Sequence, residues 1–213
     1  MRDHPYFALA IHDNAELAMI LNNDIQQRTT LHEWPLSFVE KIDIQDGRQF
    51  IYKSQRTPSI EPAFYAQTQS PLLCPGKTIY QSSHHSCMIL DYLAAPLMQN
   101  STLSETAIVR IGRDLQTAIG NLEGNPPHIF DVTTIARWRR FVETILGNIN
   151  DLITAGKFQQ VNRTARHKLA RYALSSPVIA AIELNPGYVH GDLTSDNIFL
   201  LPDGYRVIDW AYP

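Results

Sequence analysis

The segment from residue 189 to residue 210 constrains the fold more than any other part of the sequence. Two β-prone runs of four residues each flank the turn 202–204, which ends in glycine. A three-residue hairpin loop places glycine at its left-handed position, so the spacing predicts a β-hairpin with Asn197 opposite Asp209. Directly opposed residues have Cβ atoms about 4.5–5.5 Å apart. The sequence therefore predicts an amide oxygen and a carboxylate close together at the open end of a hairpin.

Two oxygen donors at this spacing suit Mg²⁺, which takes few protein ligands together with water and phosphate oxygens. Asp192 lies five residues before Asn197, in a loop with His190. A carboxylate there can orient a hydroxyl nucleophile and accept its proton while the metal neutralises phosphate charge. A His-x-Asp pair can also bind a transition metal, and a plain loop is an alternative for His-Gly-Asp alone. The whole pattern favours phosphoryl transfer over these alternatives.

This pattern resembles the catalytic loop and metal-binding segment of the protein-kinase-like fold, most closely its aminoglycoside phosphotransferase and choline kinase branch. That branch carries His-Gly-Asp, then Asn, then Ile-Asp-Trp or Ile-Asp-Phe, as this sequence does between residues 190 and 210. The resemblance implies that Asp192 is the catalytic base and that His190 supports its loop. It also implies that Asn197 and Asp209 hold Mg²⁺, and that ATP or GTP is the phosphoryl donor.

The same resemblance requires a lysine on a strand and a glutamate on a helix, which together position the phosphates. Asp46-Gly47 predicts a hairpin, and Lys53 lies on its second strand. Glu61 lies near the start of the next predicted helix, 58–69. Each residue also has a structural alternative. With a two-residue turn Lys53 would pair with Glu40 across the strands, and Glu61 could simply be an acidic residue that favours a helix N-terminus.

Turn signals separate short strand-like runs before residue 95, whereas helical spacing dominates after it. We therefore expect a bilobal α+β protein of the protein-kinase-like class. Its small N-terminal nucleotide-binding lobe, 1–93, would hold an antiparallel sheet and a helix. Its C-terminal lobe, 94–213, would be mainly helical and carry the catalytic loop and metal-binding hairpin. The resemblance makes the segment after the apolar run 87–90 a hinge, so that Asp91 and Leu93 would meet the purine.

Three longer helices are expected in the second lobe. Thr102 and Glu105 fit a capping box before a helix that Gly124 and the following prolines end. Apolar residues at helical spacing predict the second helix over 134–155. The third, over 164–184, should be interrupted at Pro177.

Two departures from the family pattern stand out. Residues 14–46 contain no glycine, so a glycine-rich phosphate-covering loop is missing and another turn, such as 27–33, would have to replace it. The sequence also stops four residues after Asp209, where family members usually continue with helices that shape the acceptor pocket. The second lobe is therefore expected to be incomplete, as a shortened chain, a natural truncation or a degenerate member. An unfinished lobe would expose apolar surface and favour self-association.

Composition excludes several other classes of protein. The formal net charge of −3 gives no support for nucleic-acid or membrane-surface binding. The longest apolar run is far shorter than the ~20 residues of a membrane-spanning helix, and the short apolar stretch near the N-terminus does not fit a signal peptide. Two cysteines, Cys74 and Cys87, are too few for a disulfide scaffold, so we expect a cytoplasmic protein.

Three functions remain to be compared. The leading hypothesis is a small-molecule kinase that moves the γ-phosphoryl group of ATP or GTP to a hydroxyl of an aminoglycoside-, choline- or sugar-like acceptor. The alternative is a catalytically silent nucleotide-binding pseudoenzyme or truncated regulatory module of the same fold, favoured by the missing glycine-rich loop and the missing C-terminal helices. A protein kinase ranks lowest, because the loop at 190–192 lacks the usual arginine and Asp209 is followed by Trp210.

Overall fold

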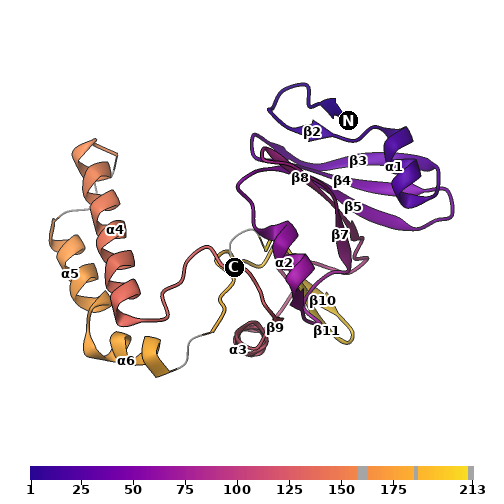
Figure 1. The fold of residues 1–213 in the computed structure, drawn as a ribbon. Coiled ribbons are helices and arrows are strands. Elements are labelled where there is room, and N and C mark those ends of the chain that lie inside the picture. Colours follow the sequence, from indigo (N-terminus) through magenta and orange to yellow (C-terminus); the bar gives the residue numbers. More distant parts are fainter. Residues whose placement is uncertain (158–162, 185–186, 211–213) are drawn as a thin grey trace. The chain divides into compact units, whose positions relative to one another are not determined.

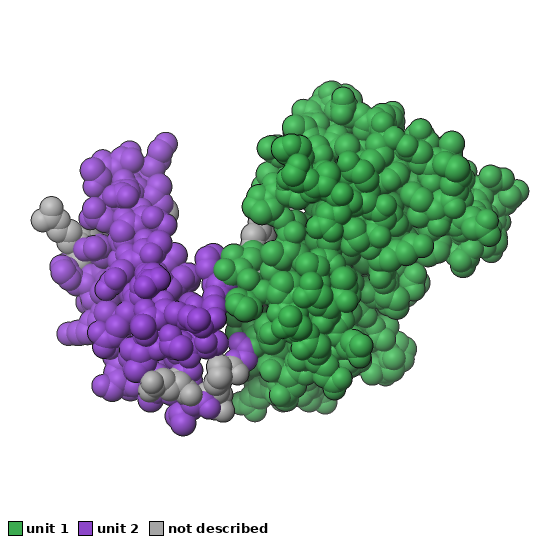
Figure 2. Space-filling view, viewed as in Figure 1, with its two compact units in different colours: residues 1–129, 188–213 green, residues 130–187 purple. Residues whose placement is uncertain are grey.

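The chain divides into two compact units, shown in different colours in Figure 2. The structure, a computed structural model, describes residues 1–157, 163–184 and 187–210. One unit is formed by residues 1–129 and 188–213, and the other by residues 130–187. The lobe boundary after residue 93 stays a prediction.

The first unit is built around a five-stranded antiparallel sheet with the order β3-β4-β5-β8-β7 (Figure 1). This sheet confirms the predicted α+β class, and both strands of the predicted Asp46-Gly47 hairpin belong to it. Its strands are β3 (Ile25–Trp34), β4 (Ser37–Ile44), β5 (Gln49–Arg56), β7 (Gly76–Gln81) and β8 (His85–Asp91). β5 is the middle strand, so its backbone is hydrogen-bonded on both sides.

The β4–β5 turn differs by one residue from the predicted one. Ile44 and Arg48 close a three-residue loop, and Gly47 takes the left-handed conformation with φ +88°. This register places Lys53 opposite Val39, so the predicted cross-strand pair of Lys53 with Glu40 is wrong. Glu40 instead accepts a hydrogen bond from Arg28 Nε at 2.9 Å.

The sheet buries apolar side chains on both of its faces. On β4 burial alternates strictly, as expected for a strand with one face in a core. The core on this face includes residues of α1 (Asn14–Leu21) and of β2 (Ala10–Ile11), which pairs with the exposed strand β1 (Arg2–Asp3). Its buried members are Leu9, Ile11, Leu17, Phe38, Ile42, Ile44, Tyr52, Cys87 and Ile89. On the other face Cys74, Met88 and Leu90 are buried, and Tyr65 of helix α2 (Glu61–Gln67) packs against them.

A second core of this unit contains residues of α2 (Glu61–Gln67), the 3₁₀ helix η1 (Met98–Asn100), α3 (Glu105–Gly120) and the carboxyl-terminal hairpin. The short pair β6 (Thr68–Gln69) and β9 (Glu123–Gly124) also belongs to this unit. The predicted apolar positions Ile111, Leu115 and Ile119 of α3 are buried. The predicted capping box at Thr102 is wrong, because the helix begins later and the Ser104 hydroxyl accepts from the Ala107 N–H at 3.2 Å.

The carboxyl-terminal hairpin consists of β10 (Ile198–Leu201) and β11 (Gly204–Val207). Its existence was predicted, but its register was not. Leu201 pairs directly with Gly204, so the loop has two residues instead of three. Asn197 is therefore opposite Ile208, whose N–H donates to the Asn197 carbonyl at 3.0 Å, and the predicted Asn197–Asp209 pairing is wrong.

The second unit contains α4 (Ile135–Thr154), α5 (Arg163–Ala173) and α6 (Ser176–Leu184). The Trp138 indole N–H donates to the Ala173 carbonyl at 2.7 Å and ties α4 to the end of α5. The predicted break falls at residues 174–175, just before Pro177. This proline thus occupies the first turn of α6, where its missing N–H removes no helical hydrogen bond.

None of the helices in the described part of the chain is both long and apolar enough to cross a membrane.

Candidate active site

Lys53 is the residue around which the candidate site is built. β5 places its side chain on the same face of the sheet as Met88, its direct neighbour on β8, and the whole residue is 9% exposed. Its ammonium nitrogen lies 2.5 Å from Glu61 Oε2 and 2.8 Å from Asp209 Oδ1. The hydrogen bond from Lys53 to Asp209 thus joins two residues that are 156 positions apart in the sequence.

Glu61 is the first residue of α2 and is 1% exposed. A carboxylate is favoured at this position by the helix dipole, and Pro62 suits the first turn. These are the features of the predicted structural alternative, but they do not account for the burial. A buried carboxylate requires a charged or hydrogen-bonding partner, and Lys53 supplies it.

Burial and neighbouring charges act on Lys53 in opposite directions. Desolvation alone would lower its pKa, but the carboxylates of Glu61 and Asp209 outweigh it and raise the pKa above the ordinary lysine value. Lys53 is therefore held positively charged in a site that excludes water. Such a lysine is suited to binding anionic oxygens, including those of phosphate groups.

His190 supports the loop that carries Asp192. Its Nε2 lies 3.0 Å from the Ile208 carbonyl and must donate to it, while Nδ1 accepts from the Asp192 backbone N–H at 3.2 Å. Burial lowers the pKa of His190, although the Ile208 carbonyl and the nearby Asp209 and Asp192 carboxylates act to raise it. The imidazole is thus neutral near pH 7, and only the neutral ring can accept from Asp192.

Asn197 closes the same loop from its other end. Its amide nitrogen lies 2.9 Å from the Asp192 backbone carbonyl and 3.4 Å from Asp192 Oδ2, and its Nδ2 also lies 3.3 Å from Thr194 Oγ1. These contacts all use the amide nitrogen, and none of them uses the side-chain carbonyl oxygen. Residues 190–197 thus form one hydrogen-bonded loop in which Asp192 has a fixed backbone.

Asp209 lies immediately beyond the hairpin and is one of two non-glycine residues with a positive φ among those described, at +63°. Trp210, which follows it, is fully buried and stacks on Phe64 of α2 with a centroid distance of 4.6 Å. Its indole N–H donates to the Val207 carbonyl at 2.8 Å. The buried tryptophan therefore fixes the chain where Asp209 turns towards Lys53.

The structure does not connect the two predicted purine-binding residues to Lys53 by any direct contact among the described residues. Asp91 ends β8, and its backbone is already engaged: its N–H donates to the Pro75 carbonyl and its carbonyl accepts from the Cys74 thiol. Leu93 packs against the cluster that contains Met88, the neighbour of Lys53. Both residues therefore lie at the end of β8, on the strand next to that of Lys53.

The suggested phosphate-covering turn at 27–33 is wrong, because these residues lie within β3. The turn that joins β3 to β4 is formed by Trp34, Pro35, Leu36 and Ser37. The Trp34 indole N–H donates to the Ser37 hydroxyl at 2.7 Å, and the Leu36 carbonyl accepts from the Arg56 N–H at 2.9 Å. Since Pro35 has no N–H, this turn offers fewer backbone donors than a glycine-rich loop.

Three contributors to the site were missed at the level of sequence. Phe64 supports Trp210, Thr194 contacts the Asn197 amide, and Tyr65 buries its hydroxyl without a hydrogen-bond partner among the described residues. Burial raises the pKa of Tyr65 well above its ordinary value, with the Glu61 carboxylate adding to the effect. The position of Tyr65, one helical turn after Glu61, is the signal that could have identified it.

Comparison with known proteins places this geometry in context. The model of the phosphotransferase enzyme family matches residues 68–212, which is more than half of the chain. A comparison with curated protein sequences finds no match.

Three solved structures resemble the fold. The macrolide 2'-phosphotransferase MphH from Brachybacterium faecium is 15% identical with a TM-score of 0.58, and the match covers 92% of this chain and 70% of that one. A thermostable aminoglycoside phosphotransferase variant, solved with AMP-PNP and hygromycin B, is 18% identical with a TM-score of 0.57 and covers 93% and 70%. A type I macrolide 2'-phosphotransferase is 13% identical with a TM-score of 0.55 and covers 95% and 73%.

Proposed function

Because the chain belongs to the phosphotransferase enzyme family, we propose that it transfers the γ-phosphoryl group of ATP to a hydroxyl of a small molecule. The observation that carries this proposal is the contact of Lys53 with both Glu61 and Asp209. A buried lysine whose charge is favoured by a helix carboxylate and by the aspartate after a hairpin is suited to orienting phosphates. The acceptor class is proposed as aminoglycoside-, choline- or sugar-like, and the named aminoglycoside and macrolide enzymes support a hydroxyl-bearing small molecule.

The residues present fit a magnesium ion. Asn197 uses its amide N–H groups within the loop, which leaves its oxygen available, and Asp209 uses only Oδ1 towards Lys53. In the described part of the chain there is no group of three or more His, Cys, Asp or Glu residues that could hold a metal. We propose that Asn197, Asp209 and oxygens of the nucleotide would hold the metal, a donor set that Mg²⁺ prefers. Bound there, it would neutralise charge on the phosphates.

In the proposed reaction Asp192 orients the acceptor hydroxyl and accepts its proton as the hydroxyl oxygen forms a bond to the γ-phosphorus. The bond between that phosphorus and the bridging oxygen breaks, and ADP leaves. Lys53 binds the phosphates, and Glu61 keeps it in place. Asp91 and Leu93, at the end of β8, are proposed to border the purine.

The direct test is phosphoryl transfer from ATP, followed by ³¹P NMR with aminoglycoside, macrolide, choline and sugar acceptors. Replacing Asp192 by Ala should reduce the rate by about 10²–10⁴-fold, the usual contribution of a general base. The matched control is Asp196→Ala, which removes an exposed carboxylate four residues away. Transfer that survives unchanged in the Asp192 variant would show that this role is wrongly assigned.

The β3–β4 turn favours a second candidate function. A turn with Pro35 in place of glycines supports weaker phosphate binding, as in a pseudoenzyme or regulatory module that binds nucleotide without turnover. This alternative predicts nucleotide binding but no transfer to any acceptor, with either ATP or GTP. Measurable transfer would exclude it.

A further inference from the structure

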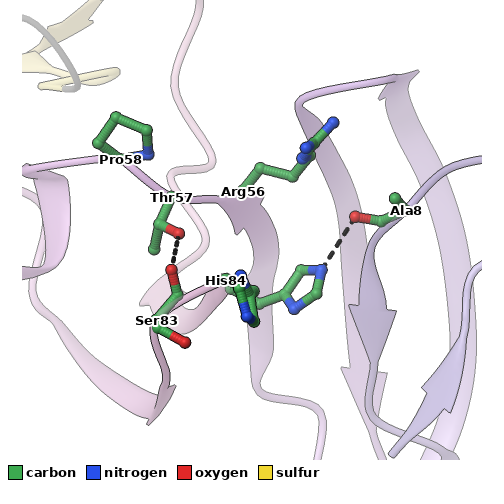
Figure 3. Close-up of a pocket in the computed structure, with 7 residues that line it drawn as sticks. Ala8, Arg56, Thr57, Pro58, Ser83 and His84 are labelled. Atoms are coloured by element: carbon green, nitrogen blue, oxygen red, sulfur yellow. Dashed lines mark hydrogen bonds between the residues drawn. The ribbon is translucent and has the colours of Figure 1, made fainter.

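A hollow of about 440 Å³ lies at the end of the sheet where β5 leads towards α2 and β8 begins (Figure 3). It is formed by the residues that end β5, by the turn before β8 and by Ala8. Figure 3 shows these side chains around the hollow, with one hydrogen bond from Thr57 to Ser83 and one from a histidine ring to Ala8. The lining residues are Ala8, Arg56, Thr57, Pro58, Ser83, His84 and His85.

This hollow is separate from the candidate active site. Successive residues of a strand point to opposite faces of the sheet. Lys53 and Arg56 are three positions apart on β5, so their side chains belong to opposite faces. Ser54, on the face of Arg56, donates to the Ala10 carbonyl at 2.7 Å, which places this face towards the N-terminal segment and away from Glu61.

The register of the sheet brings one guanidinium and two imidazoles together at the hollow. Arg56 pairs directly with His85 across β5 and β8, and His84 lies next to it in the sequence. No carboxylate lines the hollow, and Arg56 makes no ion pair with any described residue. The Arg56 guanidinium thus has no carboxylate beside it, in a chain whose 21 acidic residues outnumber its 18 lysines and arginines. An anion bound in the hollow would supply the counter-charge.

Several of the lining groups are held in place by hydrogen bonds. His85 Nε2 lies 2.9 Å from the Ala8 carbonyl, and the Thr57 hydroxyl donates to the Ser83 carbonyl. The Thr57 N–H donates to the His84 carbonyl at 2.9 Å. The Arg56 guanidinium, the His84 ring and the Ser83 hydroxyl are the donors in the lining without such a bond among the described residues.

We propose that this hollow binds the phosphate group of a small organic phosphate. A guanidinium presents paired N–H donors that match phosphate oxygens, and the imidazole and hydroxyl add further donors. The volume lies within the range of small-molecule sites and exceeds what a phosphate ion alone would fill, so the rest of the ligand has room. The ligand would bind next to the segment that links Lys53 to Glu61, on the face of the sheet opposite to their ion pair.

The test follows the side-chain NMR signals of His84 and His85 in the full chain, at constant pH and ionic strength. The probes are inorganic phosphate, glucose 6-phosphate and glucose. Both phosphates should shift the His84 signal in a saturable way, and glucose should not. Arg56→Gln should weaken phosphate binding about tenfold or more, as expected for a lost charge-assisted contact.

The matched control is Arg48→Gln, which removes the same charge just before β5 begins and should leave the titration unchanged. His84→Gln provides a second variant, followed through His85, and should also weaken binding. An unshifted His84 signal, equal binding by the Arg56 and Arg48 variants, or a response to glucose equal to that of its phosphate would each overturn the assignment.

Discussion

Lys53 and Asp209 form one ion pair, but two different kinds of structure hold them. Lys53 lies on the middle strand of a five-stranded sheet and is almost fully buried. Asp209 follows a two-stranded hairpin, its backbone has a positive φ, and its side chain is 42% exposed. We therefore expect Lys53 to be the fixed side of the pair and Asp209 the movable side, which can exchange its contact with Lys53 for another partner. Glu61, 1% exposed, would keep the lysine charged during such an exchange.

The largest expected effect concerns the fixed side of the pair. Lys53→Met leaves the buried Glu61 carboxylate without its partner and should lower the free energy of unfolding by about 3–5 kcal/mol. Urea unfolding measures this, with Lys77→Met as the control for an exposed lysine. The double variant Lys53→Met/Glu61→Gln should recover part of the loss. A Lys53 variant as stable as the control would mean that the buried pair is not formed.

A smaller effect is expected where Trp210 anchors the movable side. Trp210→Phe retains an aromatic ring against Phe64 but loses the N–H to the Val207 carbonyl, which should cost about 1–3 kcal/mol. Trp138→Phe is the matched control, since its N–H also donates to a backbone carbonyl, but from a residue that is only partly buried. If the two variants lose equal stability, the burial of Trp210 does not anchor Asp209.

The pH dependence of the free energy of unfolding tests the loop that carries His190, which lies near the Asp209 carboxylate. Burial lowers the pKa of His190 in the folded chain, so the unfolded chain binds its proton more readily. Stability should therefore be complete above the ordinary histidine pKa of about 6.5 and decrease as the pH falls below it. The lowered pKa of His12 acts in the same direction. The free energy of unfolding should therefore differ less between about pH 7.5 and 5.5 in His190→Gln than in the unmodified chain. An unchanged difference would assign the pH dependence to other groups.

The smallest effect is expected for Asp209→Asn. Lys53 keeps Glu61 in this variant, and Asp209 is partly exposed, so the loss of stability should be about 1 kcal/mol or less. Thermal unfolding beside Lys53→Met gives the comparison directly. A loss as large as that of Lys53→Met would contradict the distinction between a fixed and a movable side.

The sequence predicted both hairpins but gave each loop the wrong length. Gly47 belongs to a three-residue loop, whereas Gly204 is already paired with Leu201, and a glycine within a turn motif does not tell which of these it will be. Strand β3 was missed because it is an exposed edge strand, so its residues do not alternate between apolar and polar. The two errors in loop length shift the strand pairing by one residue, and the third error hides a strand. None of them changes the class of fold.

The candidate site could be predicted only in part. His190, Asp192 and Asn197 lie within one short loop, and local spacing was enough to group them. The contact between Lys53 and Asp209 joins residues 156 positions apart. The family resemblance assigned Lys53 to the phosphates and Asp209 to the metal, but neither it nor the local spacing predicted that the two side chains touch. The support of Trp210 by Phe64 depends on how α2 packs, which no local pattern contains.

The most direct test of the central claim is calorimetric titration of the chain with ATP, in the presence and absence of Mg²⁺, with GTP as a second donor. If Lys53, Asn197 and Asp209 form the proposed nucleotide site, ATP binding should depend on Mg²⁺ and be lost or strongly weakened in Asp209→Asn. The stability of that variant, measured in parallel, separates loss of the site from loss of the fold. Nucleotide binding that is indifferent to both Mg²⁺ and Asp209, or no binding of either nucleotide, would contradict the account.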